Sequence, residues 1–244
     1  MKTACITGAG RGIGRATALK LAECGYNLIL NTGHDEAALI SLKEEIIGIT
    51  KNENSCIISV GDVGESSYAN SLIESGLTAF GSIDVLINNA GVSYVGLLTD
   101  MSDEDINKVV NTNLLSAIYM SRAIIPSMVH NKKGRIINIS SMWGVVGASC
   151  EAIYSATKGG INAFTQAIAK ELAPSNISVN ALTLGVIDTD MNKCFSEDER
   201  KALAEEIPMG RMGKPSEVAD FIYNLIESPS YLTGSIIDFD GGWI

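Results

Sequence analysis

Short apolar runs alternate along the chain with longer segments in which apolar residues recur every three or four positions. The short runs predict seven buried strands, at residues 3–7, 26–31, 56–60, 83–89, 134–140, 177–183 and 235–240. The longer segments predict helices at residues 13–24, 35–49, 66–80, 103–129 and 153–172. This alternation is typical of βαβ units, so the pattern predicts an α/β fold with a doubly wound, seven-stranded parallel sheet and helices on both faces.

The chain is expected to form a single domain, residues 1–244, because no linker, repeat or low-complexity tract interrupts the pattern. Its least regular long stretch, residues 188–213, follows the sixth strand and mixes apolar with charged residues. Ligands bind beyond the carboxyl ends of the strands in such sheets, so we expect this stretch to be a substrate-side lid that orders with cofactor. The alternative is a fixed pair of surface helices.

The charge balance argues against some partners. Lys and Arg number 18 and Asp and Glu 28, so the formal net charge is −10, which is unfavourable for binding nucleic acid. No apolar stretch approaches the ~18 to 20 residues that cross a membrane, and the N-terminus does not resemble a signal peptide. Five scattered cysteines without CxxC or zinc-like spacing favour a reducing, cytoplasmic location and no metal site.

A glycine-rich loop, TGAGRGIG at residues 7–14, follows the first strand and opens the first helix. Glycines there let the backbone approach a pyrophosphate, whose charge the helix N-terminus attracts, as in a Rossmann dinucleotide-binding domain. The alternative is a strand-to-helix turn that only happens to be rich in glycine. The cofactor-binding residues predicted in this loop are Thr7, Gly8, Gly10, Arg11, Gly12, Ile13 and Gly14.

The ends of two further strands carry residues that could bind the same cofactor. Asp62 and Val63 follow the third strand and suit the edge of an adenine ring, although Asp62 suits a helix cap equally well. The fourth strand ends in NNAG, residues 88–91, whose side-chain amides could hold adjacent loops together. The candidate cofactor residues in that motif are Asn89, Ala90 and Gly91.

The end of the second strand favours NADP(H) over NAD(H), which remains possible. An NAD-specific domain of this kind places an acidic residue there, against the ribose hydroxyls. This chain has Asn31 and Thr32 instead, while Asp35 comes late and suits a helix N-cap. A 2′-phosphate would meet no repulsion, and Arg11 together with Asn31, Thr32 and His34 could bind it.

A phenol and an ammonium stand four positions apart in YSATKGG, at Tyr154 and Lys158. Positions i and i+4 share a helix face, so the ammonium is expected to lower the pKa of the phenol. A bound nicotinamide cation would lower it further. Tyr154 could then act as a general acid in a chain with only two histidines. The alternative is a surface helix with an unrelated Tyr and Lys.

The motifs together give the chain its resemblance to a known family. The glycine loop, NNAG, Asn113 in NTNL, Ser141 in NISS and the Tyr154/Lys158 pair occur in an order and at intervals that resemble the short-chain dehydrogenases/reductases. The resemblance implies that Tyr154 donates a proton to a substrate carbonyl whose oxygen Ser141 also binds, while Ser140 points elsewhere.

The resemblance also implies roles around this pair. Lys158 would bind the nicotinamide ribose, and Asn113 would hold a water that links Lys158 to solvent. Asn88 and Asp62 would line the cofactor site. The residues implied to contact the cofactor beyond the sixth strand are Gly185, Ile187 and Thr189.

The C-terminal stretches 207–228 and 231–243 are similar to 3-oxoacyl-acyl-carrier-protein reductases. That similarity implies a homotetramer that reduces a carrier-bound β-ketoacyl thioester with NADPH, in fatty acid biosynthesis, with an acyl carrier protein as partner. Leu184 stands where the family usually has proline, so the loop after it is expected to be more mobile. Ser175 stands where an arginine is expected. Lys132, Lys133 and Arg135 remain as basic residues that could attract an acidic carrier protein.

Other functions stay open. The stretch with Trp143, Cys150 and Glu151 resembles reductases that act on the 5-aminopentanone group attached to elongation factor P. Glu151 could receive an ammonium there, or could simply be a solvated residue at a helix N-terminus. Another small ketone is a third substrate. A non-catalytic NADP(H)-sensing regulator is the alternative from another class, and it is disfavoured because such a protein would be expected to lose the Tyr, Lys or Ser, and all are present.

Overall fold

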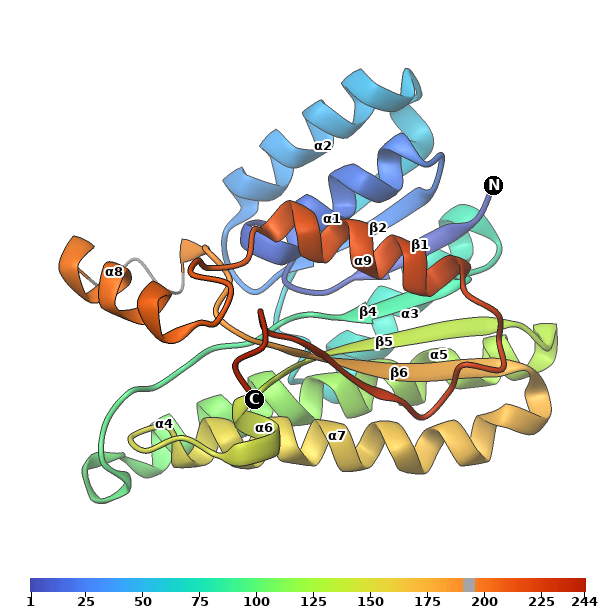
Figure 1. Ribbon diagram of the computed structural model, residues 1–244. Helices are drawn as coiled ribbons and strands as arrows, with labels where there is room; N and C mark the ends of the chain where they lie inside the picture. Colours follow the sequence, from blue (N-terminus) through green and yellow to red (C-terminus); the bar gives the residue numbers. More distant parts are fainter. Residues whose placement is uncertain (191–195) are drawn as a thin grey trace.

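A computed structural model of the chain describes residues 1–190 and 196–244 (Figure 1). Its centre is a seven-stranded sheet in the order β3-β2-β1-β4-β5-β6-β7, and every neighbouring pair of strands is parallel. The strands are β1 (Thr3–Ile6), β2 (Asn27–Thr32), β3 (Cys56–Val60), β4 (Val85–Asn88), β5 (Gly134–Ser141), β6 (Ile177–Leu184) and β7 (Ile236–Phe239). The order reverses direction at β1, so the doubly wound sheet predicted from the sequence is confirmed.

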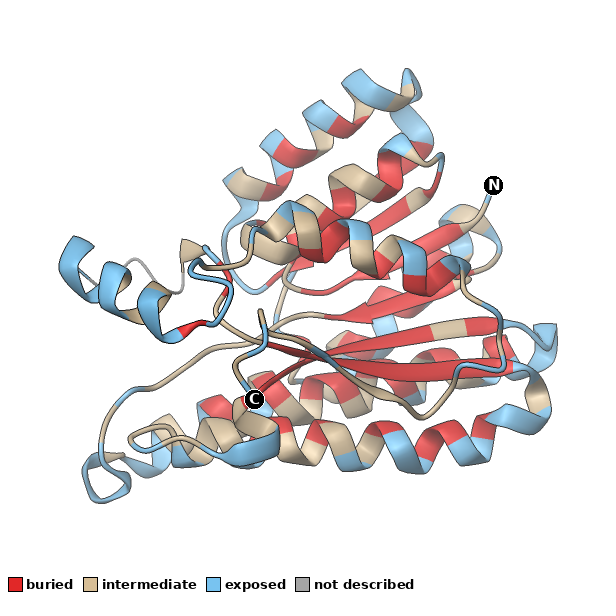
Figure 2. Ribbon diagram, in the orientation of Figure 1, coloured by how far each residue is buried: buried red, intermediate tan, exposed pale blue. Residues whose placement is uncertain are grey.

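Helices cover both faces of the sheet, as Figures 1 and 2 show. One buried apolar cluster joins the sheet to α1 (Gly12–Glu23), α2 (Glu36–Thr50) and α9 (Pro215–Glu227). A second cluster joins it to α3 (Ser66–Phe80), α5 (Ser116–Asn131) and α7 (Ala152–Leu172). None of the helices in the described residues is apolar enough over a sufficient length to cross a membrane.

Alternating side chains along the inner strands β1, β2, β4, β5 and β6 belong to the two clusters in turn. In β2, Leu28 and Leu30 belong to the first cluster and Ile29 to the second. Because both faces of the strand are covered, its apolar run is nearly continuous, which is the pattern that made the strands visible in the sequence.

The helix predicted over 103–129 is interrupted. The structure has α4 (Asp103–Val110), one π-helical turn at Asn111–Leu115 and then α5. The backbone N–H of Ser116 reaches back five residues to the carbonyl of Asn111. A π-turn inserts one extra residue into the helix, and this one turns the Asn113 side chain into the interior.

Helix α9 lies where no element was predicted. Pro215 is its first residue and the Glu217 carboxylate accepts from the Lys214 N–H at 2.8 Å, both normal features of a helix start. Shorter elements were also missed: α6 (Trp143–Val146) and the 3-10 turns Glu53–Ser55, Leu98–Asp100 and Ala173–Ser175. Helix α8 (Glu197–Glu206) lies in the stretch 188–213, for which surface helices were the alternative to a lid. The carboxyl ends of the strands open toward α6, α8 and the C-terminus, and the candidate site lies there (Figure 1).

Candidate active site at the carboxyl edge of the sheet

The glycine loop packs directly against the end of β4. Gly8 has φ +64° and Gly12 has φ +55°, a region that side chains disfavour. A Cβ at Gly8 would lie 2.9 Å from the Cα of Ala90, and one at Gly14 would overlap the carbonyl oxygen of Gly8. The loop therefore has no room for side chains at these positions.

Thr7 and Asn89 tie the first and fourth strand ends together. The Asn89 amide donates to the carbonyls of Thr7 and Gly8, both at 3.0 Å. The Thr7 hydroxyl accepts from the N–H groups of Asn89 and Ala90, also at 3.0 Å. Asn88 instead donates to the buried side chains of Ser121 and Asn138, so it supports the sheet and is not the cofactor-lining residue that was expected.

The segment after β6 lies over the glycine loop. A Cβ at Gly12 would be 3.3 Å from the Thr189 methyl group, so these two candidates face each other. Ile187 forms a parallel bridge to Gly213, and a Cβ at Gly185 would collide with Asp240. Within the described residues, the N-cap Arg11 makes no side-chain hydrogen bond to helix α1, so the first N–H groups of the helix are not capped by it. The close backbone and the uncapped helix fit the pyrophosphate of a dinucleotide.

The structure corrects one contact predicted at the end of β2, that of Asn31 with a 2′-phosphate. Asn31 is buried, and its amide donates to the carbonyls of Thr32, Ser59 and Gly61 and to the Tyr68 hydroxyl. It holds β2 against the end of β3 and is not free for a phosphate, because its donors already have internal partners.

Thr32 and Arg11 remain at the predicted 2′-phosphate position. The Thr32 hydroxyl oxygen lies 3.5 Å from where a Cβ on Gly10 would be. Arg11 is exposed, and none of the described residues accepts a hydrogen bond from its guanidinium. Asp35 accepts from the Ala38 N–H at 3.0 Å, which confirms it as the N-cap of α2.

Beyond β3, Asp62 acts in a turn. Its carboxylate accepts from the Gly64 N–H at 2.7 Å, and its carbonyl accepts from Glu65 at 3.0 Å. Val63 is buried in the apolar cluster with α3. Asp62 does not cap the next helix, because the N-cap of α3 is Glu65. The Asp62 carboxylate is exposed, and its contact with an adenine ring stays a prediction.

Helix α7 presents Tyr154 and Lys158 on one face, next to the end of β5. The Lys158 Nζ donates to the Ile139 carbonyl at 2.8 Å and lies 5.6 Å from the centre of the Tyr154 ring. Ser141 hydrogen-bonds Tyr154. Ser140 donates to the Lys158 carbonyl at 3.2 Å, so it points away from the site as expected.

Burial dominates the acidity of this pair. Loss of water around the phenol raises the pKa of Tyr154 to about 12, although the hydrogen bond with Ser141 opposes the rise. Burial likewise lowers the pKa of Lys158 to about 8. The pKa of Tyr154 is thus raised and not lowered in the chain by itself, contrary to the expectation from Lys158, because burial of the phenol dominates.

Asn113 reaches the same place from the π-turn. Its side-chain oxygen accepts from the Val92 N–H and its amide donates to the Val92 carbonyl, both at 2.8 Å. A Cβ at Gly91 would lie 3.5 Å from the Asn113 oxygen and 3.7 Å from Lys158 Nζ. Gly91 therefore keeps open a small space that both side chains border.

A profile of the family described as short chain dehydrogenase matches residues 2–200. The chain belongs to this family. Its members are NAD(P)-dependent oxidoreductases, which leaves the non-catalytic regulator without support.

Relatives match this short-chain dehydrogenase over its whole length. It is 39% identical to an uncharacterized oxidoreductase, YmfI, of Bacillus subtilis, over 99% of this chain and 98% of the relative. It is 37% identical to the 3-oxoacyl-[acyl-carrier-protein] reductase FabG of Thermotoga maritima (100% and 98%). It is 38% identical to the 3-oxoacyl-[acyl-carrier-protein] reductase of Synechocystis (100% and 97%).

Two site neighbours of this short-chain dehydrogenase were missed or undervalued from sequence. Ser93 donates to the Glu151 carboxylate at 2.6 Å, which joins the loop after β4 to the start of α7. Trp243 meets Trp143 edge to face. Each contact joins segments far apart in the chain, and no motif or spacing marks Ser93 or Trp243.

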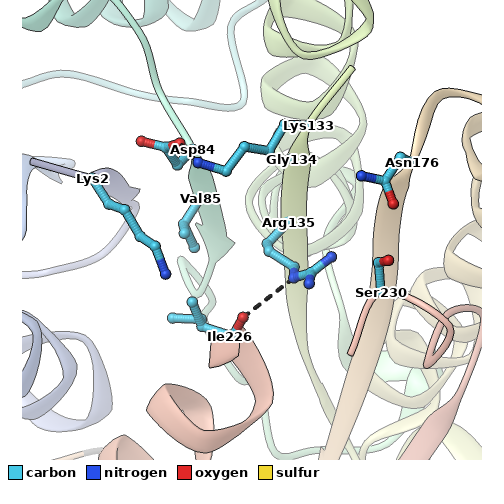
Figure 3. A pocket seen from close by; sticks show the side chains of 9 residues that line it. All are labelled: Lys2, Asp84, Val85, Lys133, Gly134, Arg135, Asn176, Ile226 and Ser230. Atoms are coloured by element: carbon cyan, nitrogen blue, oxygen red, sulfur yellow. Dashed lines mark hydrogen bonds and ion pairs between the residues drawn. The ribbon is translucent and has the colours of Figure 1, made fainter. Parts of the chain in front are cut away.

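The basic residues expected to guide an acidic carrier lie at the amino edge of the sheet, opposite to the candidate site. Lys132, Lys133 and Arg135 are at the amino end of β5, six residues or about 20 Å along the strand from Ser141. There a cavity of ≈ 220 Å³ opens (Figure 3), lined by Lys2, Asp84, Val85, Lys133, Gly134, Arg135, Asn176, Ile226 and Ser230. These cations therefore do not border the candidate site at the carboxyl end of β5.

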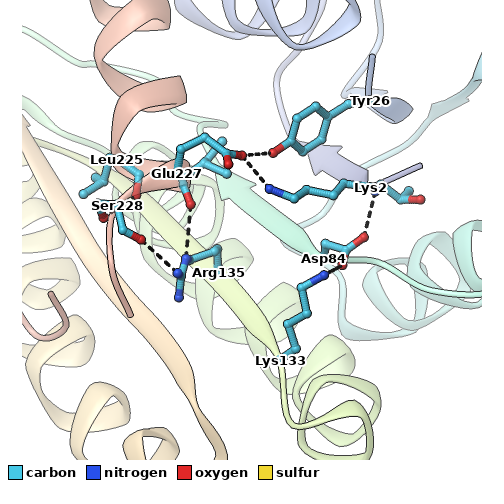
Figure 4. Close-up of polar contacts among 10 residues, drawn as sticks. Lys2, Tyr26, Asp84, Lys133, Arg135, Leu225, Glu227 and Ser228 are labelled. Carbon is cyan, nitrogen blue, oxygen red and sulfur yellow. Dashed lines mark hydrogen bonds and ion pairs between the residues drawn. The ribbon is translucent and has the colours of Figure 1, made fainter. Parts of the chain in front are cut away.

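Internal partners satisfy most charges around that cavity (Figure 4). Lys133 pairs with Asp84 at 2.8 Å and Lys2 with Glu227 at 2.6 Å. Arg135 donates to the carbonyls of Ile226 and Ser228 at the end of α9. The network joins the N-terminus, the sheet and α9, so we assign it a structural role.

Proposed function

We propose that the protein reduces a ketone to a secondary alcohol with NADPH. The observation that carries the proposal is the convergence of Ser141, Tyr154 and Lys158 at the same edge of the sheet as a glycine loop whose close backbone suits a dinucleotide. NADPH supplies the hydride when it is bound. The Ser141 hydroxyl and the Tyr154 phenol bind the substrate carbonyl oxygen, and Tyr154 gives it a proton.

Lys158 has two roles in this proposal. Its ammonium, held by the Ile139 carbonyl, stabilises the phenolate that Tyr154 becomes after proton transfer. It also binds the nicotinamide ribose. Protons return to Tyr154 through Lys158 and the space that Gly91 leaves beside Asn113, where a water completes the path.

NADP(H) is the proposed cofactor because β2 ends without an acid. Thr32 and the exposed Arg11 offer a hydroxyl and a cation to a 2′-phosphate. The proposed phosphate and nicotinamide contacts come from the glycine loop, Gly185, Ile187 and Thr189.

The first candidate substrate is a 3-oxoacyl thioester on an acyl carrier protein. The names of the Thermotoga maritima and Synechocystis relatives support this substrate. A homotetrameric, cytoplasmic enzyme of fatty acid biosynthesis is part of the same proposal. The carrier would have to dock without the basic residues expected to guide it, since these lie at the opposite edge.

The second candidate is the 5-aminopentanone group on elongation factor P. The position of Glu151 favours it, because this carboxylate lies close enough to Tyr154 to raise the pKa of the phenol. A negative charge beside the site suits an amine-bearing ketone better than an acidic carrier protein.

Steady-state kinetics with NADPH separate the two candidates. The substrates to compare are acetoacetyl-acyl carrier protein and aminopentanone-modified elongation factor P, with Tyr154→Phe as the inactive control. A kcat/KM at least about a hundredfold higher for one identifies the substrate class. If neither is reduced and no simpler ketone is reduced either, ketone reduction itself is overturned.

A further inference from the structure

Tyr68 lies in the first turn of α3, and its ring covers the end of β3. A Cβ on Gly61, the residue that follows β3, would overlap this ring, so the missing side chain of Gly61 leaves the space that the ring fills. The ring also packs against the apolar cluster on this face of the sheet. Its packing therefore fixes where the Tyr68 hydroxyl lies.

The Tyr68 hydroxyl joins the ends of two neighbouring strands. It shares a hydrogen bond of 2.6 Å with the Ser59 hydroxyl of β3 and accepts from the Asn31 amide of β2 at 3.2 Å. Asn31 and Ser59 are direct partners in the parallel register. In the described part of the chain β3 is an edge strand that pairs with β2 alone, so the phenol adds a side-chain tie where the sheet has support from one side.

This tie reaches the proposed cofactor site through the backbone of β2. The Asn31 carbonyl accepts from the Ala9 N–H of the glycine loop at 2.8 Å, and the Thr32 carbonyl accepts from the Gly61 N–H at 2.9 Å. Side chains alternate along a strand, so Asn31 faces α3 while Thr32 faces the other side, toward Gly10. Holding Asn31 in place therefore also sets the position of Thr32.

Filling of the apolar core does not account for the Tyr68 hydroxyl. A phenylalanine would fill the same space, whereas the phenol places a polar atom between two polar side chains at strand ends, where ligands bind in such sheets. Thr32 offers a single hydroxyl to a 2′-phosphate, and a hydrogen bond weakens steeply with poor geometry. A small displacement of the end of β2 would therefore cost this contact.

We propose that Tyr68 is a positioning residue for the 2′-phosphate of NADP(H), because it fixes the end of β2 through Asn31 and with it the Thr32 hydroxyl. The inference rests on the proposed cofactor and adds a residue that determines its selectivity. Tyr68 acts through Asn31 and is assigned no contact with the cofactor. NAD(H) lacks the phosphate, so a displaced Thr32 affects its binding less.

Equilibrium binding tests the proposal without turnover. Tyr68→Phe keeps the ring on Gly61 and removes only the hydroxyl. Fluorescence titrations should show a Kd for NADPH raised by about three- to tenfold and a Kd for NADH raised less, so that the preference for NADPH falls. Kinetics should show a raised KM for NADPH with kcat near wild type, because Ser141, Tyr154 and Lys158 lie on other elements.

Hydrogen exchange in the cofactor-free protein gives a second readout. The amides of Ala9 and Gly61 donate to the carbonyls at the end of β2, so both should exchange faster in Tyr68→Phe than in wild type. The Thr7 amide donates to the Ile87 carbonyl of β4 at 3.1 Å and should exchange at an unchanged rate, which makes it the internal reference.

Tyr119→Phe is the matched control. Tyr119 is another partly buried tyrosine that packs against the same apolar cluster, on α5, and the loss of its hydroxyl should leave both Kd values unchanged. Ser59→Ala keeps Tyr68 but removes its partner on β3, and it should lower the preference for NADPH in the same direction. If Tyr68→Phe does not fold, Ser59→Ala decides.

The possible failures are distinguishable. A preference for NADPH that survives Tyr68→Phe, or affinities for NADPH and NADH that fall together, overturn the positioning role and leave the proposed cofactor intact. Wild-type protein that binds NADPH no more tightly than NADH overturns the proposed cofactor, and the positioning role with it.

Discussion

The indole rings of Trp143 and Trp243 meet edge to face, with 5.9 Å between their centroids and 66° between their planes. The backbone N–H of Trp143 donates to Ser141 Oγ at 3.2 Å, so the ring pair lies on the segment that carries a proposed catalytic hydroxyl. The C-terminal turn is fixed by Asp240, whose carboxylate accepts from the N–H groups of Gly242 and Ile244 at 2.9 Å. The end of the chain thereby supports the Ser141 loop.

Trp243→Ala is expected to weaken that support. Loss of the ring pair should lower the free energy of unfolding by about 0.5–1.5 kcal/mol, and less restraint on Trp143 should raise KM more than it lowers kcat. Chemical denaturation and steady-state kinetics measure the two effects. Trp243→Phe keeps an aromatic edge and should lie close to wild type; unchanged stability and KM in the alanine variant would show that the contact is incidental.

Tyr154→Phe should keep the fold and the binding of NADPH but remove the proton donor. General acid catalysis contributes typically ~10² to 10⁴-fold, so kcat should fall within that range. Fluorescence titration with NADPH checks that the cofactor still binds. Near-full kcat in the variant would show that Tyr154 is not the acid.

Glu151→Gln should shift the pH profile of alcohol oxidation with NADP⁺ toward lower pH. Oxidation needs the Tyr154 phenolate, so its rate rises with pH as the phenol ionises. Glu151 raises the pKa of Tyr154, and removing its charge must therefore lower that pKa and move the rising limb down. Lys158 is common to both proteins, so the comparison isolates Glu151. A limb that stays in place, or moves up, contradicts the assignment.

Thr32→Asp should move cofactor preference from NADPH toward NADH. An aspartate at this position would repel the 2′-phosphate and accept hydrogen bonds from the ribose hydroxyls, changing the ratio of kcat/KM values on the order of tenfold or more. Thr32→Asn adds the same shape without charge and should keep the NADPH preference. A wild-type protein that prefers NADH would contradict the proposed cofactor.

The sheet and most helices were predictable because the five inner strands, β1, β2, β4, β5 and β6, are buried on both faces. Ile29 and its neighbours Leu28 and Leu30 feed different cores, which leaves a continuous apolar run in the sequence. The π-turn at Asn113 left no such trace, because an extra residue in a helix hardly changes the apolar period. Helix α9 was overlooked although Pro215 is an ordinary helix start.

The candidate site also has residues that the sequence predicts and residues that it does not. Tyr154 and Lys158 form one short motif, and the glycine loop forms another. The arrangement of the residues within each motif therefore follows from local structure. The role of Asn31 could not be foreseen, because it depends on where the carbonyls of Ser59 and Gly61 end up beside it. Ser93 and Glu151 are 58 positions apart, and only the folded loops bring them together.

The lid expected at 188–213 is open to a direct test on its described part, residues 188–190 and 196–213. Helix α8 has no buried residue and projects from the body of the molecule (Figures 1 and 2). Arg200 on α8 pairs with Asp188 at 2.6 Å, an exposed contact of little strength. By contrast, Ile207 is buried, and Gly213 exchanges backbone hydrogen bonds with Val186 and Asp188 at 3.0 and 2.8 Å.

Hydrogen exchange with and without NADPH should therefore divide this segment. Amides of α8 should exchange fast in the free protein and more slowly with cofactor, whereas those at Ile207 and Gly213 should be protected in both states. Leu184→Pro, which restores the residue usual in the family, should slow exchange at the base of the segment if the loss of proline loosens it. Strong and equal protection of α8 in both states would mean that it is a fixed wall of the site, since a lid must open in at least one of them.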